Sequence, residues 1–160
     1  MQHGNQVEWA IHCCAVLAGL PEGRRLSVAS LAEFHGVPKA YLAKGLQRLE
    51  DAGILSGSVG PKGGYQLAKP AAEISLLDIV LGLEGNSNCF RCTDIRFNNP
   101  CLVNRGKGPC LIAVAMRKAE KAYHRELAQT SLADVLRELA ETADQPTLER
   151  SAEWFAERIR

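Results

Sequence analysis

The sequence predicts a mainly α-helical protein: a winged helix-turn-helix with a two-stranded β wing, followed by a long dimerisation helix and short C-terminal helices. Two short amphipathic segments, residues 27–36 and 38–53, flank a tight turn that contains Gly36, the arrangement typical of a helix-turn-helix. Residues 54–68 change to strand-like periodicity around the glycine-rich sequence GPKGG, which predicts a hairpin. Residues 111–129 carry apolar side chains at helical spacing throughout.

The length and composition fit one ordinary domain, or a small domain with an oligomerisation arm. The chain has 160 residues and a hydrophobic share of 46%, which is enough for a core and argues against disorder. The apolar run from Trp9 to Leu20 contains His12 and follows Glu8 rather than a basic segment, unlike a secretory signal. It is also too short to span a bilayer. We therefore expect a cytoplasmic protein without a membrane partner.

The first helix is expected over residues 7–19, and nearly all of its surface is apolar. Only the strip formed by Glu8, His12, Ala15 and Gly19 separates its two apolar faces. A helix that is apolar on all sides is normally buried on all sides, and in a chain this small such burial indicates a second subunit. Cys13 and Cys14 lie in the middle of this helix, and we interpret both as small buried core residues.

The next elements have recognisable boundary signals. Ser27 is a suitable N-cap for the second helix, and Gly36 is suited to end it. Pro38 fits the first position of the third helix, which Gly53 stops. The remaining elements are expected as strands over 54–59 and 65–68, a helix over 74–83 capped by Ser75 or a residue near it, the long helix over 111–129, a short helix capped by Thr130-Ser131 that ends near Thr142, and a last helix opened by Pro146.

The middle of the chain carries the features of a DNA-binding surface. Residues 38–69 hold five basic and two acidic side chains, whereas residues 120–160 hold six basic and nine acidic ones, so only the middle is suited to meet phosphate. Scattered lysines alone also fit a solvated helix, but a basic helix followed by a glycine-rich wing favours DNA. The candidate DNA-binding residues are Lys39, Tyr41, Lys44, Arg48, Lys62, Gly63 and Gly64.

Residues 85–110 lose all periodicity, and loops of this length are usually functional. The segment holds four of the six cysteines, at positions 89, 92, 101 and 110. Thiolates are soft ligands that select zinc or iron–sulfur clusters, and stable disulfides are rare in the cytoplasm. Three interpretations stay open: an iron–sulfur cluster, a four-thiolate zinc site that stabilises a DNA-binding or interaction module, or unligated thiols.

Glu8 and His12 are four residues apart and therefore share one face of the first helix. Such a pair is commonly an ordinary helix contact. On a helix that is otherwise apolar, however, a carboxylate and an imidazole need partners. A metal ion is one partner that would satisfy both.

No enzyme motif is visible in the chain. There is no phosphate loop, nucleophile elbow or paired-carboxylate pattern. A hairpin turn explains the glycines at 60, 63 and 64 better than a nucleotide-binding loop does. We therefore expect neither enzymatic activity nor a small-molecule substrate.

The stretch VPKAYLAKGLQRLEDAGILSGSVGPKGGYQLAKPAAEISLLDIVLGLEG resembles the BadM/Rrf-type winged-helix iron–sulfur transcription regulators, which include IscR, NsrR and RsrR. The resemblance covers residues 1 to about 130. It implies a homodimeric regulator, most often a repressor, that binds a double-stranded DNA operator and whose long helix crosses to the partner subunit. It divides the chain into a DNA-binding domain at 1–84, a cluster-binding loop at 85–110, and a dimerisation helix with C-terminal helices at 111–160.

The sequences VEWAIHCC, CTDIR and CLIAVAM are most similar to the RsrR branch. That resemblance implies a 2Fe-2S cluster held by Cys92 and Cys110 of one subunit and by Glu8 and His12 of the other. Much of the family instead uses three cysteines of this loop, which keeps Cys101 as an alternate ligand, and 4Fe-4S and zinc as alternative cofactors. The spacing of nine residues between successive cysteines from 92 to 110 is wider than the family's usual gaps.

A histidine ligand removes negative charge from an iron–sulfur cluster and raises its potential. We therefore expect a cluster that cycles by one electron and acts as a redox sensor. Trp9 lies beside Glu8 in the sequence, and it is our candidate for relaying a change at the cluster to the DNA-binding helices.

Overall fold

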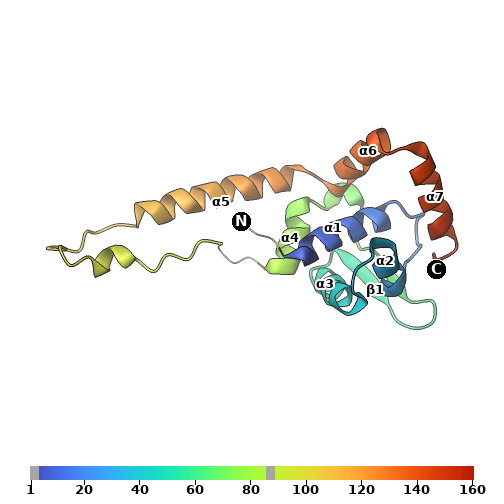
Figure 1. Ribbon diagram of the computed structural model, residues 1–160, viewed down its shortest axis with the longest axis horizontal. Helices are drawn as coiled ribbons and strands as arrows, with labels where there is room; N and C mark the ends of the chain where they lie inside the picture. Colours follow the sequence, from blue (N-terminus) through green and yellow to red (C-terminus); the bar gives the residue numbers. More distant parts are fainter. Residues whose placement is uncertain (1–3, 86–88) are drawn as a thin grey trace.

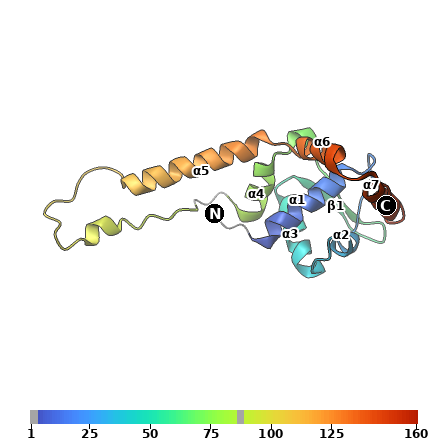
Figure 2. The ribbon, with the colours of Figure 1, turned by 45° about the horizontal axis from the view of Figure 1, so that its top comes forward.

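The chain folds into a helical body from which a long arm projects. The computed structural model describes residues 4–85 and 89–160. Figures 1 and 2 show the arm, residues 89–129, extending away from the body. The elements of the described chain are α1 (Asn5–Ala18), α2 (Val28–His35), α3 (Lys39–Asp51), β1 (Leu55–Ser58), β2 (Gly64–Leu67), η1 (Ala71–Glu73), α4 (Leu76–Glu84), η2 (Ile95–Asn98), α5 (Leu111–Gln129), α6 (Leu132–Thr142) and α7 (Gln145–Ala156). The predicted mainly helical class with a two-stranded sheet is confirmed.

The helix-turn-helix is formed by α2 and α3, which share one core with α1 and α4. The Ser27 side chain accepts a hydrogen bond of 3.0 Å from the Ser30 amide, so it caps α2 as predicted. Gly36 follows α2 in the left-handed conformation at φ 64°, which favours glycine. Pro38 stands at the N-cap of α3, one position earlier than predicted.

The wing is an antiparallel hairpin that pairs residues 55–58 with residues 64–67. The first strand is shorter than predicted, covering 55–58 instead of 54–59, and the second keeps its predicted length of four residues but begins one position earlier, at 64. A further bridge joins Leu26 to Tyr65, whose backbone groups exchange hydrogen bonds of 3.1 and 2.8 Å. This bridge fastens the wing to the segment that leads into α2.

Helices α4 and α6 begin with the same capping box. In each, a serine side chain accepts from the backbone of an aspartate three residues later, whose carboxylate accepts from the serine backbone: Ser75 with Asp78, and Ser131 with Asp134. A bridge joins Ser75 to Ser131. The end of α5 is therefore tied to the start of α4, and this contact anchors the base of the arm to the body.

One face of α1 is buried and another is exposed. Cys13 and Cys14 have no exposed surface, which confirms that they are core residues. Glu8 and His12 are exposed, so within one chain α1 is not buried on all sides. The predicted burial of this strip against a second subunit stays a prediction.

Most of α5, the helix of the arm, is exposed to solvent within one chain. Only Ala113 and Glu120 of this helix are buried. In the part of the chain that the structure describes, every helix is too short or too polar to cross a lipid bilayer.

Candidate DNA-binding surface and cysteine site

A groove of about 820 Å³ lies between α3 and the wing. We call it the wing groove. Its walls come from the start of α2, the wing strands and turn, and three side chains of α3. A groove between a helix and a wing is the shape that can hold a nucleic-acid backbone beside a recognition helix. The α3 side chains that line it are Lys39, Gln47 and Glu50.

The predicted DNA-binding residues of α3 lie on more than one side of the helix. Lys39 lines the wing groove, whereas Tyr41 and Arg48 line a second groove of about 780 Å³ together with Trp9. The Arg48 Nη1 atom donates to the Leu83 carbonyl oxygen at 3.2 Å, which turns this guanidinium toward α4. Lys44, the remaining candidate on α3, is exposed. Its ammonium nitrogen lies 6.0 Å from the centre of the Tyr41 ring.

The wing places Lys62 on an exposed turn between Gly60 and Gly63. A Cβ atom on Gly63 would lie 2.3 Å from the Ser58 carbonyl oxygen, and one on Gly64 would lie 2.5 Å from the Leu26 carbonyl oxygen. Real Cβ atoms do not approach backbone this closely. These glycines are therefore required for packing within the protein, a reason that the sequence pattern did not reveal.

Cys92 and Cys110 are brought together where the arm enters α5. Their sulfur atoms and a carboxylate oxygen of Asp94 all lie within 4.8 Å of one another. Cys110 is the N-cap of α5, and hydrogen bonding from the Ala113 and Ile112 amides lowers the pKa of its thiol, with the nearby Arg96 charge acting in the same direction. This is the environment in which a thiol becomes a thiolate, the form that binds metal.

Arg96 holds this site in shape. Its guanidinium donates to Asp94 Oδ1 at 3.1 Å and to the carbonyl oxygens of Gly108 at 2.6 Å and Pro109 at 3.3 Å. The side chain therefore joins the segment that carries Cys92 to the residues just before Cys110. The Arg96 guanidinium therefore lies close to the thiols of Cys92 and Cys110.

The other two loop cysteines lie apart from this pair. Cys89 is exposed, and its amide donates to Glu120 Oε1 at 2.6 Å. A hydrogen bond with Glu120 raises the pKa of the Cys89 thiol. Cys101 is also exposed and lies outside the group formed by Cys92 and Cys110. Within residues 4–85 and 89–160, a site made of all four thiolates is therefore not assembled.

Glu8 and His12 open onto a pocket of about 240 Å³ on the body. Its other walls are Trp9, His35 and Val37. The rings of His12 and His35 are 5.8 Å apart. The Nε2 atom of His35 is buried without a hydrogen-bond partner among the described residues, and burial lowers the pKa of this imidazole, followed by the charge of His12. The pocket thus holds a carboxylate, an imidazole and one unsatisfied nitrogen.

The two groups of candidate ligands are far apart in one chain. Cys92 and Cys110 lie at the outer end of α5, and α1 lies in the body (Figure 1). At a rise of about 1.5 Å per residue, 19 residues of α5 span about 28 Å. A single chain therefore does not bring Glu8 and His12 to the two cysteines.

Four residues at these sites were not singled out from the sequence. Asp94 and Arg96 form part of the CTDIR motif, but their roles depend on the loop conformation, including the left-handed backbone of Asp94 at φ 51°. Glu120 contacts Cys89, 31 residues away in the sequence. His35 contacts His12, 23 residues away. Sequence periodicity does not report such contacts.

Comparison with known proteins gives the family. Residues 3–138 match the model of the Rrf2 family, described as an iron-dependent transcriptional regulator. YffB of Lactococcus lactis subsp. lactis, named as an HTH-type transcriptional regulator, is 33% identical over 129 residues, which cover 80% of this chain and 82% of YffB. The confirmed resemblance is thus to regulators and not to enzymes.

Solved structures agree with this assignment. The oxidized form of Staphylococcus aureus CymR has a TM-score of 0.64 and 26% identity over 85% of this chain and 96% of CymR. The structure of T. potens IscR, at 22% identity, has a TM-score of 0.68 over 92% of this chain and 96% of IscR, and shows the same fold. The chain therefore belongs to the Rrf2 family and is a DNA-binding transcriptional regulator, not an enzyme.

Proposed function

We propose that the protein is a homodimeric repressor whose affinity for its operator is set by an iron–sulfur cluster shared between subunits. Cys92 and Cys110 of one subunit and Glu8 and His12 of the other are the proposed ligands. One observation carries the proposal: the chain holds two incomplete ligand groups that it does not bring together itself. A second copy supplies to each group what it lacks.

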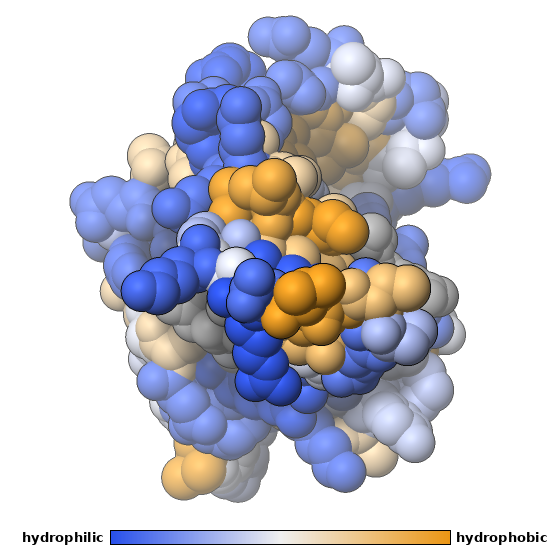
Figure 3. Space-filling view, turned by 90° about the vertical axis from the view of Figure 1, so that its left-hand side faces the viewer, coloured by the Kyte–Doolittle hydropathy of each residue, from blue (hydrophilic) through white to orange (hydrophobic). Residues whose placement is uncertain are grey.

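The exposed apolar surface of the arm supports the dimer. Figure 3, viewed from the outer end of the arm, shows hydrophobic atoms gathered near the centre of this face. Leu111 and Ile112, at the start of α5, are 80% and 67% exposed. Monomeric proteins rarely leave such a contiguous apolar patch in water. We therefore assign residues 111–129 to the dimer interface, 85–110 to cluster binding and 1–84 to DNA binding.

Two thiolates, an imidazole and a carboxylate can hold zinc or an iron–sulfur cluster, and the description of the matching family as an iron-dependent regulator favours the cluster. A thiolate pair is a soft donor set, and two histidine nitrogens replace two thiolates in Rieske centres. Such a cluster supplies one-electron redox chemistry. Among the residues of this chain, Arg96, which is ion-paired with Asp94, fixes the spacing of the two thiols.

Trp9 is suited to link this site to α3. Its side chain lines the pocket that contains Glu8 and His12, and it also lines the groove that contains Tyr41 and Arg48. A change in the first pocket can therefore alter the second through one side chain. We assign to Trp9 the role of a relay from ligand pocket to DNA-binding helix.

Anaerobic purification with iron, sulfide and zinc analysis tests the cofactor. We expect a red-brown protein with iron and sulfide in equal amounts, and Cys92→Ala, Cys110→Ala and His12→Ala each lose or strongly alter the visible spectrum. Cys101→Ala is the matched control and keeps it. A colourless protein with stoichiometric zinc would establish the alternative, a structural zinc module. Loss of the spectrum in Cys101→Ala, with a normal spectrum in both Glu8→Ala and His12→Ala, would establish three-cysteine ligation.

Gel-shift titration tests the DNA surface. Lys44→Ala and Lys62→Ala are expected to weaken operator binding about tenfold each, the scale of one charge-assisted contact. Lys62→Ala also lowers the salt dependence of binding, because a wing lysine neutralises phosphate. Arg150→Ala, an exposed arginine of α7 outside the assigned DNA-binding and dimer segments, is the control. Wild-type affinity in both Lys44→Ala and Lys62→Ala would show that the DNA surface lies elsewhere.

A further inference from the structure

The last sixteen residues, 145–160, lie outside the part of the chain that matches the family model. They nevertheless pack against the DNA-binding elements. Figure 1 shows α7 beside α2 and the wing, at the end of the body opposite the arm. Residues 145–160 are therefore close enough to the DNA-binding elements to influence their conformation.

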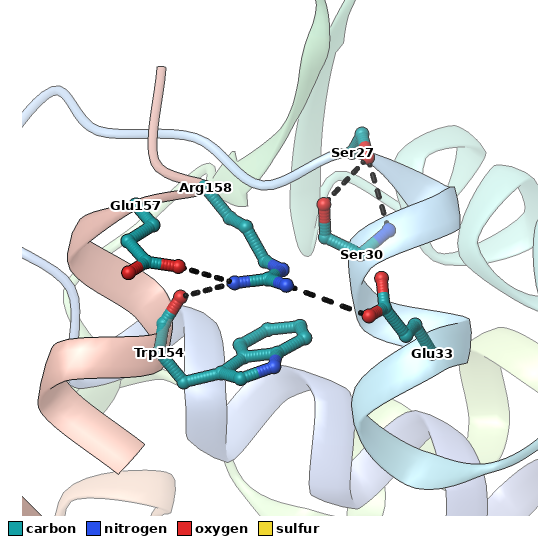
Figure 4. A network of polar contacts seen from close by, with 6 residues as sticks. All are labelled: Ser27, Ser30, Glu33, Trp154, Glu157 and Arg158. Atoms are coloured by element: carbon teal, nitrogen blue, oxygen red, sulfur yellow. Dashed lines mark hydrogen bonds and ion pairs between the residues drawn. The ribbon is translucent and has the colours of Figure 1, made fainter. Parts of the chain in front are cut away.

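Helix α7 is fixed to α2 by aromatic and charged contacts. The Phe34 ring centre lies 4.5 Å from that of Phe155 and 5.2 Å from that of Trp154. Figure 4 shows Arg158 between the two helices: its guanidinium lies over the Trp154 ring, 4.0 Å from the centre, and pairs with Glu33 at 3.5 Å. These contacts set the direction in which the chain leaves α7.

The chain then forms a strand-like pair with the segment before α2. The Arg25 amide donates to the Arg160 carbonyl at 3.1 Å, and the Arg160 amide donates to the Arg25 carbonyl at 3.0 Å. The next residue, Leu26, pairs in the same way with Tyr65 of β2 on its opposite side. Residues 25–26 therefore link the wing on one side to residue 160 on the other through backbone hydrogen bonds.

The Arg160 side chain reaches from this pair to the wing turn. Its Nη1 atom donates to the carbonyl oxygens of Pro61 at 2.8 Å and Gly63 at 3.0 Å. These carbonyls flank Lys62, the proposed phosphate contact. Arg160 also lines the wing groove. The guanidinium therefore holds the tip of the wing from the side of the body.

We propose that Arg160 is a positioning residue for DNA binding, which fixes the wing turn so that Lys62 meets the phosphate backbone. A hairpin turn that carries one lysine among three glycines has many conformations when free, and ordering it on DNA costs entropy. Two hydrogen bonds from a charged donor reduce that cost before DNA arrives. This inference rests on the proposed DNA surface and extends it to a segment outside the matched region.

Two measurements on the full chain test the proposal. The first needs no DNA: cleavage after Lys62 by a lysine-specific protease is expected to be several-fold faster in Arg160→Ala than in wild type. Arg150→Ala, an exposed arginine of α7, is the charge-matched control and is cut like wild type. The second is a double-mutant cycle in operator binding with Arg160→Ala and Lys62→Ala. Arg160→Ala alone is expected to weaken binding about tenfold, and Lys62→Ala is then expected to cost much less in the Arg160→Ala background.

These experiments distinguish a failure of the positioning role of Arg160 from a failure of the proposed DNA surface. Equal cleavage rates in Arg160→Ala and wild type would overturn the positioning role, and so would additive effects in the cycle, which would make Arg160 an independent DNA contact. If Lys62→Ala and Lys44→Ala both bind the operator like wild type, the proposed DNA surface fails and this role fails with it. Faster cleavage in that case would locate the error in the DNA surface rather than in the contact between Arg160 and the turn.

Discussion

At the scale of single residues, the six cysteines occupy different chemical environments. Burial raises the pKa of the Cys13 thiol to about 12 and that of Cys14 still further, so both stay protonated. A hydrogen bond with Glu120 raises the pKa of Cys89. Backbone N–H groups at the start of α5 lower the pKa of Cys110. The sequence shows six identical side chains, and only the fold separates a thiol whose pKa is lowered, Cys110, from thiols whose pKa is raised.

Alkylation of the metal-free protein tests this ordering. Because the thiolate is the reactive form, Cys110 is expected to react with iodoacetamide at lower pH than Cys89, and Cys13 and Cys14 to react only after unfolding. Peptide mapping by mass spectrometry measures each site across a pH series. Identical pH profiles for Cys110 and Cys89 would contradict the assigned environments.

At the scale of elements, local signals in the sequence predict the helices well. The capping serines 27, 75 and 131 and the breaker Gly36 act where expected, because caps depend on residues within one turn. The docking of α7 on α2 was not predicted, since it depends on pairs such as Phe34 with Phe155 that are 121 residues apart. The cysteine pair likewise depends on Arg96, which joins residues separated by an irregular loop.

The wing depends on glycine for packing, and substitution tests this. Gly64→Ala would place a Cβ atom 2.5 Å from the Leu26 carbonyl oxygen, so we expect the free energy of unfolding to fall by about 1–3 kcal/mol, the usual cost of overpacking. Gly106→Ala, where nothing lies within 4 Å of the added atom, is the matched control. Denaturant unfolding of both variants gives the comparison. Equal stability would show that the Leu26 segment can move away from β2 at little cost.

At the scale of the whole molecule, the division of ligands between arm and body makes a prediction about mixed dimers. Cys92→Ala and His12→Ala homodimers are each expected to lack the normal cluster. A heterodimer of the two keeps one complete site, formed by the cysteines of the His12→Ala chain and the Glu8/His12 pair of the Cys92→Ala chain. Co-expression with two affinity tags should therefore recover about half of the wild-type iron per dimer.

The control pairs Cys92→Ala with Cys110→Ala. Both variants are damaged in the same half of the site, so neither site of that heterodimer is complete and no spectrum returns. If the Cys92→Ala and His12→Ala pair also stays colourless while both homodimers fold, the ligands are not shared across the interface.

The long, exposed helix α5 determines which mutations the protein can accept. Its exposed polar positions tolerate substitution, since only Ala113 and Glu120 are buried in one chain, whereas the exposed apolar residues of the proposed dimer interface do not. Its length is a different matter. Each residue inserted between Cys110 and Thr130 turns the outer end of the helix by about 100° and moves it by about 1.5 Å, so in the proposed dimer the thiols would face away from the partner's ligands. An insertion after Glu120 would also turn Glu120 away from Cys89. We expect a segment whose exposed polar positions can vary but whose residue count is fixed, a constraint that substitution scanning does not detect and that single-codon insertions and deletions would.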